Sequence, residues 1–213
     1  MKAKVITFPV GLYQCNCSII YCPESKEAIL IDPGSEAETI LKKINDQGLK
    51  IKAIIHTHAH LDHFGATHEV SESTDASVHL HKDDMQLWNI ADLQAEMLGL
   101  PKCPHANVDH FIEDSQSFEF GEFKLEAIHT PGHSAGSTCF KIENSDEQLL
   151  FSGDTLFRRG VGRTDLPSGD SREIAKSIKE KLYKLDIDTT VIPGHGPNTV
   201  IGEEKRQNPF ITA

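Results

Sequence analysis

A cluster of three histidines and one aspartate follows directly after an apolar segment in the first third of the chain. The cluster is Thr57-His58-Ala59-His60-Leu61-Asp62-His63, and the segment before it is Ile51-Lys52-Ala53-Ile54-Ile55. Short runs rich in Ile and Val are typical of buried strands, so we expect the cluster where a strand ends and the backbone turns. Alternate residues of an extended chain share a side, so the first two histidines can face one metal ion. The aspartate and the third histidine can face a second. Imidazole and carboxylate groups are ligands that zinc and similar divalent metals prefer.

Three later segments each offer one more ligand in a turn that follows an apolar run. They are Thr130-Pro131-Gly132-His133-Ser134, Phe151-Ser152-Gly153-Asp154-Thr155 and Ile192-Pro193-Gly194-His195-Gly196. A glycine precedes each ligand and allows the backbone to approach a crowded site. A solvated His-rich turn, or histidines hydrogen-bonded in a core, would explain the first cluster but not this repetition. The sequence therefore predicts a metal site at the edge of a sheet, where several strands end.

The combined motif His58-x-His60-x-Asp62-His63, followed by His133, Asp154 and His195, resembles that of the metallo-β-lactamase-fold superfamily. The resemblance extends from about Ile19 to Pro209. Within the superfamily, the segments 130–137, 153–157 and 162–165 resemble single-domain, glyoxalase II-like (hydroxyacylglutathione hydrolase-like) hydrolases. The resemblance implies an α/β (α+β) fold, a four-layer αββα sandwich with a binuclear metal site on one edge. It implies that one ion is held by His58, His60, His133 and Asp154, and the other by Asp62, His63, His195 and the bridging Asp154.

The same resemblance implies a metal-dependent hydrolase that acts on a thioester such as S-lactoylglutathione. The enzyme would bind two divalent ions, for which Zn²⁺ is the leading candidate and Fe or Mn are alternatives. The two ions would lower the pKa of a water that they share and give a metal-bridging hydroxide near neutral pH. Asp62 would bind the second ion and orient the hydroxide, which makes it the predicted catalytic residue. Asp32, in Asp32-Pro33-Gly34, is the candidate residue supporting the ligands from behind. A plain turn former is a comparable interpretation.

The substrate is less constrained than the metal site. Arg158, Arg159 and Arg163 are candidates for binding a substrate carboxylate, and a solvated basic loop is the equal alternative. Two-domain glyoxalase II enzymes bind glutathione through a C-terminal helical domain, for which we expect no room, because the chain ends about 18 residues after His195. The sequence Gly194-His195-Gly196-Pro197 also lacks the acidic-aromatic pair that follows the histidine in those enzymes.

A different class of enzyme remains open as an alternative. A persulfide dioxygenase would use one iron, held by His58, His133 and Asp154 as a 2-His-1-carboxylate triad. The segment 162–165 occurs in both families and does not discriminate between them, whereas the Pro-Gly-His-Gly context of His195 favours the hydrolase. β-Lactam hydrolysis is possible for the fold but has no specific support in these residues.

Charge and composition exclude several classes of partner. A net charge of −11 over 213 residues argues against nucleic acid, which needs a basic surface. No leader-like segment and no 18-residue apolar run occurs, so we expect a cytoplasmic protein with no membrane partner. The five cysteines are odd in number, and we expect free thiols. The partner is then a small-molecule thioester, and the oligomeric state is not indicated.

Hydrophobic periodicity gives the expected elements. Strands are expected at 18–21, 28–31, 51–55 and 76–80, and helices at 35–48, where Ser35 and Glu38 suggest a capping box, and at 171–185. Residues 1–213 are expected to form a single domain, because the ligands at 58 and 195 must meet. Residues 83–117 interrupt the pattern as a helical insertion whose broad apolar face suggests a core helix, with a pocket wall or lid as the alternative. The remaining seven histidines are expected to be structural: 56, 68, 79, 81, 105, 110 and 129.

Overall fold

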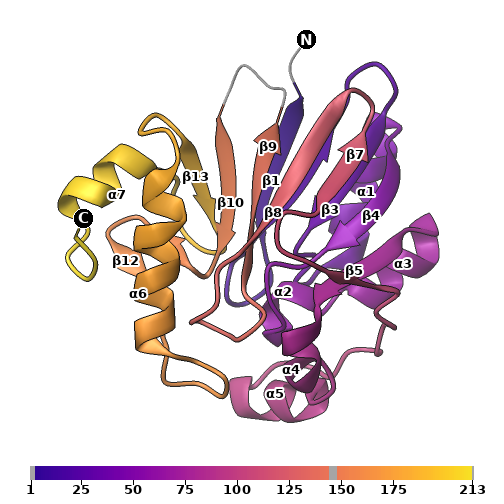
Figure 1. The fold of residues 1–213 in the computed structure, drawn as a ribbon. Coiled ribbons are helices and arrows are strands. Elements are labelled where there is room, and N and C mark those ends of the chain that lie inside the picture. Colours follow the sequence, from indigo (N-terminus) through magenta and orange to yellow (C-terminus); the bar gives the residue numbers. More distant parts are fainter. Residues whose placement is uncertain (1–2, 144–147, 213) are drawn as a thin grey trace.

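The computed structural model describes residues 3–143 and 148–212. Two six-stranded sheets face each other, with helices on both outer faces (Figure 1). The first sheet has the order β1 (Lys4–Val10), β2 (Cys15–Tyr21), β3 (Glu27–Ile31), β4 (Lys50–Ile55), β5 (Ser77–His81) and β6 (His110–Ile112). The second has the order β14 (Thr199–Val200), β13 (Thr190–Pro193), β10 (Leu149–Gly153), β9 (Thr138–Glu143), β8 (Phe123–His129) and β7 (Ser117–Phe120). A small hairpin pairs β11 (Leu156–Phe157) with β12 (Gly160–Val161).

The two-residue period of β3 explains why its sheet can be covered on both faces. Ile29 and Ile31 point into the core between the sheets, where Phe140 of β9 also lies. Ala28 and Leu30, one step along the strand, belong to the apolar layer on the outer face. Alternate side chains of a strand point to opposite faces, so a continuous apolar run is expected for a strand buried on both sides.

Amphipathic helices close both outer layers. In α1 (Ala37–Gln47), Ile40 and Ile44 are buried against the first sheet. In α6 (Ser171–Glu180), Ile174 and Ile178 are buried against the second sheet. The other helices are α2 (Leu61–Phe64), α3 (Thr67–Thr74), α4 (Met85–Trp88), α5 (Ala91–Leu98) and α7 (Ile201–Gln207). The expected four-layer αββα sandwich is confirmed.

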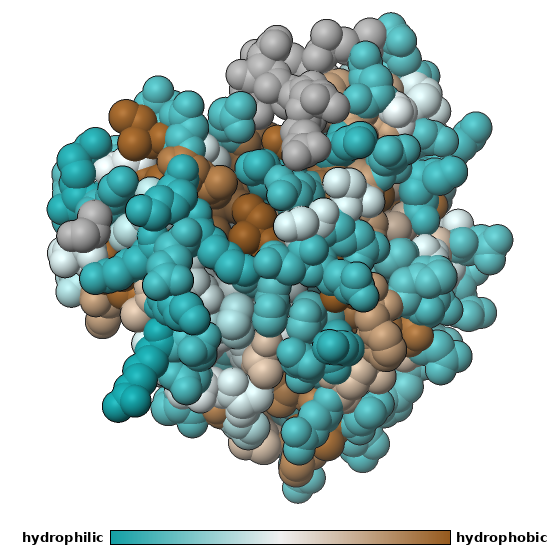
Figure 2. All heavy atoms as spheres, in the orientation of Figure 1, coloured by the Kyte–Doolittle hydropathy of each residue, from teal (hydrophilic) through white to brown (hydrophobic). Residues whose placement is uncertain are grey.

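The topology brings the ends of several strands to one edge. Strand β4 is parallel to β3, and β10 is parallel to β13, so their carboxyl ends lie at the same edge of each sheet. A backbone bridge between Cys15 and His195 joins the two sheets there. Within the described ranges, no helix is both long enough and apolar enough to cross a membrane. On the face in Figure 2 most of the surface is hydrophilic, and apolar atoms lie both in a patch at the upper left and in smaller groups towards the lower end, where α4 and α5 lie.

Two predicted helices differ in detail. The predicted capping box of Ser35 and Glu38 is not formed: α1 begins at Ala37, after Glu36, and no side chain among the described residues caps it. The carboxylate of Glu36 instead accepts a hydrogen bond from Gly11 N at 2.9 Å, in the turn between β1 and β2. The predicted helix at 171–185 ends earlier, because α6 stops at Glu180 and a short 3-10 turn, Leu182–Lys184, follows.

The segment 83–117 is helical only in its first half. Its helical part is two short helices, α4 and α5, and the chain then runs without a helix to β6, which joins the first sheet beside β5. Trp88 is buried in a cluster with Phe64, on which it stacks with ring centres 4.2 Å apart. The expected core role of this apolar stripe is confirmed for that face of the helices.

Candidate metal centre

All seven predicted ligands lie together at this edge, in turns that follow β4, β8, β10 and β13. They form three overlapping groups, in each of which the ligand atoms lie within 4.8 Å of one another. The groups are His58, His60 and His133; His58, His63 and Asp154; and Asp62, His63 and His195.

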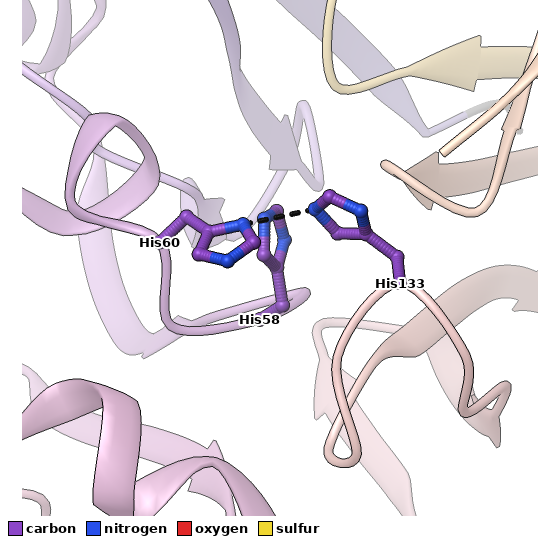
Figure 3. Close-up of side chains that lie close together, drawn as sticks. All are labelled: His58, His60 and His133. Carbon is purple, nitrogen blue, oxygen red and sulfur yellow. Dashed lines mark hydrogen bonds between the residues drawn. The ribbon is translucent and has the colours of Figure 1, made fainter. Parts of the chain in front are cut away.

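The first group draws its histidines from both sheets, and its rings point toward one another (Figure 3). His60 Nδ1 lies 2.9 Å from Nε2 of His133, which is carried by the loop between β8 and β9. His58 Nε2 is buried and has no hydrogen-bond partner among the residues that the structure describes. Burial, with the neighbouring His133, lowers the pKa of His60 to about 3. Burial also lowers the pKa of His58 well below its usual range. Both rings are therefore neutral and can offer lone pairs to a cation.

Asp62, His63 and His195 form the second group of ligands, which lies beside the first, and Asp154 lies between the two groups. His63 Nε2 is 3.1 Å from His195 Nε2, and His195 Nε2 is 3.3 Å from Oδ2 of Asp62. Asp154 Oδ1 is 3.4 Å from His63 Nε2, while its Oδ2 is 3.5 Å from His133 Nε2. The buried Oδ1 of Asp154 has no hydrogen-bond partner. Its carboxylate thus occupies the position that a ligand shared by two ions requires.

Hydrogen bonds on the outer side of the rings fix which nitrogens face inward as acceptors. His133 Nδ1 lies 2.8 Å from the carbonyl oxygen of Arg163, and His195 Nδ1 lies 2.8 Å from that of Tyr13. A carbonyl can only accept, so both Nδ1 atoms carry protons and both Nε2 atoms present lone pairs when the rings are neutral. Metal-binding histidines in proteins are held in this way by outer partners.

Asp32 plays the same part for two further histidines. Its Oδ2 accepts hydrogen bonds from His63 Nδ1 at 2.9 Å and from Thr57 Oγ1 at 2.6 Å. The Thr57 hydroxyl uses its hydrogen in the bond to this carboxylate, so its oxygen accepts a hydrogen bond from Nδ1 of His58 at 3.0 Å. Asp32 also accepts from Thr57 N at 2.8 Å, and its own backbone has a φ of 50°. This is the supporting position that the sequence predicts for Asp32.

The residues present fit two divalent cations. Nε2 of His63 faces Nε2 of His195 at 3.1 Å, and two further buried acceptor atoms, on His58 and Asp154, have no donor among the described residues. Buried polar atoms are normally paired, so such a set is unfavourable unless positive charge lies among them. Imidazole nitrogens with carboxylate oxygens suit zinc, iron or manganese.

The glycine before His195 is required by close packing. A Cβ on Gly194 would overlap Asp154 Oδ1 and lie 2.8 Å from Cε1 of His63. Likewise, a Cβ on Gly153, which has a φ of 48°, would lie 2.5 Å from the Thr57 side chain. The expectation that glycine admits the backbone to a crowded site is confirmed at these two positions.

A pocket of about 230 Å³ opens onto the centre. Its floor includes ligands from both groups, and one wall comes from α4 and α5. The predicted alternative of a pocket wall is therefore confirmed for the outer face of these helices, whose buried face packs in the core. The apolar lining consists of Leu87, Ile90, Met97, Leu98, Leu166 and Pro167.

The three candidate arginines occupy different places. Arg163 lines the pocket, and its guanidinium forms two 2.8 Å hydrogen bonds to the carboxylate of Asp165. The Arg159 guanidinium is hydrogen-bonded to Gln207 instead. Among the residues that the structure describes, neither Arg158 nor Arg159 lines this pocket. Of the three, Arg163 alone is placed to meet a substrate in it.

Two residues that support the site were not predicted. Gln94 of α5 is buried; its amide oxygen accepts from Leu61 N at 3.0 Å, and its amide nitrogen donates to Ala59 O at 2.9 Å. It thus holds the backbone of the His58–His63 turn. Tyr13 supplies the carbonyl that orients His195, and its hydroxyl donates to Leu98 O at 3.0 Å. Both act through main-chain groups of distant segments, a relationship that leaves no local motif.

A fourth group of possible ligands, His81, Asp83 and His129, does not make a comparable site. The two rings stack face to face, with centres 4.0 Å apart and planes 10° apart. In-plane lone pairs of stacked rings run parallel and cannot converge on one ion. The prediction that His81 and His129 are structural agrees with this geometry.

All five cysteines are free thiols, as expected, and burial raises the pKa of Cys15 to about 12, so that thiol stays protonated.

Comparison with known proteins matches residues 10–195 to the metallo-beta-lactamase superfamily. The chain is 39% identical over 220 residues to the hydroxyacylglutathione hydrolase GloC of Haemophilus influenzae, covering 100% of this chain and 99% of that protein. The structure of the BLEG-1 B3 metallo-beta-lactamase has a TM-score of 0.88 at 35% identity, covering 99% of this chain and 100% of that one. TTHA1623, solved in a di-iron-bound form, has a TM-score of 0.86 at 40% identity, covering 97% and 100%. With its fold and its complete set of ligand side chains, the chain belongs to the metallo-β-lactamase superfamily.

Proposed function

We propose that this metal-dependent hydrolase cleaves thioesters, with S-lactoylglutathione as the first substrate to test and Zn²⁺ as the first ion. The observation that carries the proposal is the complete ligand set, with unpaired acceptor atoms turned inward at the floor of a pocket. Two bound ions would supply an activated water near neutral pH and polarise a carbonyl oxygen. The full-length similarity to a hydroxyacylglutathione hydrolase supports the thioester class.

Asp62 is the residue of this chain best placed to orient the water. It lines the pocket, and its Oδ2 lies 3.3 Å from His195 Nε2. Burial alone would raise the pKa of Asp62, but the His63 imidazole and the hydrogen bond from His195 outweigh it, so the pKa lies below its ordinary value. The carboxylate is therefore ionised at neutral pH and can accept a hydrogen bond from the attacking water.

The pocket also suits a leaving group that needs no proton. Tyr13 is the one phenol among the lining residues that the structure describes, and its hydroxyl is already engaged with Leu98 O. A thiol has a pKa of about 8.5, so thiolate departs readily without a general acid. An amine leaving group, as in β-lactam hydrolysis, needs protonation. This difference favours a thioester over an amide.

The second ligand group supports the hydrolase over the persulfide dioxygenase. A mononuclear iron site would use His58, His133 and Asp154. Here Asp62, His63 and His195 lie complete beside that triad, with their ligand atoms within 4.8 Å of one another. A one-iron enzyme gives no role to this second group.

The test is hydrolysis of S-lactoylglutathione by zinc-loaded protein, run beside a chromogenic cephalosporin and a glutathione persulfide. We expect zinc-dependent thioester cleavage that falls by at least a hundredfold in Asp62→Ala and His133→Ala. His105→Ala is the matched control, because the His105 side chain is 51% exposed and forms no part of the pocket lining. The proposal would be refuted if fully metallated protein left thioesters intact and instead cleaved the cephalosporin or consumed oxygen with the persulfide.

A further inference from the structure

Asp84 is a buried carboxylate behind the first ligand group. It ends the 3-10 turn Lys82–Asp84, directly before α4, and its side chain is fully buried. Its Oδ2 accepts hydrogen bonds from Ala59 N at 2.9 Å and from Ser134 Oγ at 2.7 Å. Its Oδ1 accepts from Gly136 N at 2.7 Å. Three donors thus converge on one carboxylate that belongs to none of the predicted motifs.

The donors come from the two loops that carry the first ligand group. Ala59 lies between His58 and His60, in the turn that leaves the first sheet. Ser134 follows His133 in the β8–β9 loop of the second sheet, and Gly136 lies two residues further on. Asp84 therefore connects the two loops through Ala59 N on one side and Gly136 N with the Ser134 hydroxyl on the other, and it is not among the residues that line the pocket. Hydrogen bonds to an ionised carboxylate are short and strong, so they hold the loops in a defined separation.

Packing leaves little freedom at this contact. A Cβ on Gly136 would lie 2.7 Å from Asp84 Cγ and 2.9 Å from Asp84 N, so the loop approaches Asp84 as closely as a glycine permits. Burial raises the pKa of Asp84, and the hydrogen bonds from Ser134 and Gly136 oppose that rise. Placing a carboxylate in an apolar interior is unfavourable without such donors.

We propose that Asp84 is a positioning residue that sets the distance between the His58–His60 pair and His133, and thereby the affinity for the first ion. Asp32 differs from Asp84 because it serves both groups: it reaches His58 of the first group through Thr57 and bonds directly to His63 of the second. Among the residues that the structure describes, Asp84 forms no hydrogen bond with Asp62, His63 or His195 themselves, so its removal affects the second ion less than the first. The proposal rests on the metal centre, not on the thioester substrate, so failure with S-lactoylglutathione leaves it standing.

The experiment measures zinc affinity at each group separately. His195→Ala removes a ligand of the second group, so zinc titration in this background reports on the first; His60→Ala serves the reverse purpose. Asp84→Asn is added to both backgrounds, and affinity is measured by competition with a chromophoric chelator. Asparagine keeps the size of the side chain but turns an amino group toward one of the donors. Asp83→Asn is the matched control, because Asp83 is an exposed neighbour whose carboxylate lies 3.8 Å from His81 Nδ1.

We expect Asp84→Asn to weaken zinc binding about tenfold to a hundredfold at the first group, with a change of less than about threefold at the second. Asp83→Asn leaves both affinities unchanged. Equal losses at both groups, or no loss at the first, would overturn the proposal. Circular dichroism of the metal-free variants checks folding. If Asp84→Asn does not fold, Ser134→Ala removes one donor alone, and an unchanged affinity at the first group in that variant would overturn the proposal as well.

Discussion

The carboxylate of Asp32 lies 2.9 Å from Nδ1 of His63 and, through the hydroxyl of Thr57, is also connected to Nδ1 of His58. One residue therefore orients a histidine of each ligand group. The carboxylate is 2% exposed and lies in a turn with left-handed backbone at Asp32 itself. Its position behind the ligands explains why a supporting acid is needed at this point in the sequence.

The first prediction concerns this double contact. Asp32→Asn keeps one acceptor oxygen, but its amide nitrogen must then face donors: either Thr57 N at the Oδ1 position, or the Thr57 hydroxyl and His63 Nδ1 at the Oδ2 position. We expect affinity for both zinc ions to fall, about tenfold to a hundredfold each. The measurement is the two-background zinc titration described for Asp84, and a loss confined to one group would show that Asp32 does not serve both.

The second prediction uses the close packing of Gly194. In Gly194→Ala the new methyl group displaces Asp154 Oδ1, with which it would otherwise overlap. We expect turnover to fall at least tenfold, since the shared ligand must move. Gly160→Ala is the control, because its added Cβ would meet only Phe157 Cβ at 3.5 Å, an ordinary contact. Equal activity in the two variants would be inconsistent with the described geometry.

The third prediction tests the apolar pocket wall. Met97 lines the pocket and is 68% exposed, so Met97→Ser removes substrate contact with little effect on folding. Loss of roughly 1 kcal/mol of apolar contact corresponds to about a fivefold rise in KM. Leu93 lies on the same helix, is 50% exposed and is not among the pocket-lining residues. The KM of the control variant Leu93→Ser should therefore match that of the wild type. A KM that rises equally in both variants would argue against a role for this wall.

The fourth prediction concerns stability and pH. Burial, with the nearby His110, lowers the pKa of His79 from 6.5 to about 4. Between these two pH values the unfolded chain binds a proton that the folded protein does not, so stability falls as pH drops from 6.5 to 4. We expect His79→Gln to reduce this fall, measured as the melting temperature of metal-free protein across that range. An identical slope in the variant would rule out His79 as a source of the acid sensitivity.

Much of the centre was predictable because its chemistry is local in sequence. Each of the seven ligands sits beside a glycine or within the His58–His63 run, after an apolar strand. Asp84 and Gln94 were not predictable, because their side chains form hydrogen bonds with main-chain groups that lie 25 to 52 positions away in the sequence. A lone acidic or amide residue near a helix carries no signal of such a partner.

The fold shows the same division. The apolar runs of β3 and β4 predicted buried strands correctly, because burial on both faces leaves a continuous Ile-rich pattern. Strand β1 was not predicted; it is partly exposed and pairs at the sheet edge only with β2. The helical stripe at 85–98 is interrupted at Asn89 and Ile90, between the buried Trp88 and α5, whose Gln94 reaches Ala59 O. The periodicity of the apolar residues alone does not predict this interruption.

The most direct test of the account is to strip the protein of metal and follow S-lactoylglutathione hydrolysis as zinc is added back. The described centre predicts that activity rises to its maximum at two ions per chain, and that His195→Ala retains one ion with greatly reduced turnover. Full activity at a single ion per chain, or in the His195→Ala variant, would contradict the assignment of a two-ion centre to these seven residues.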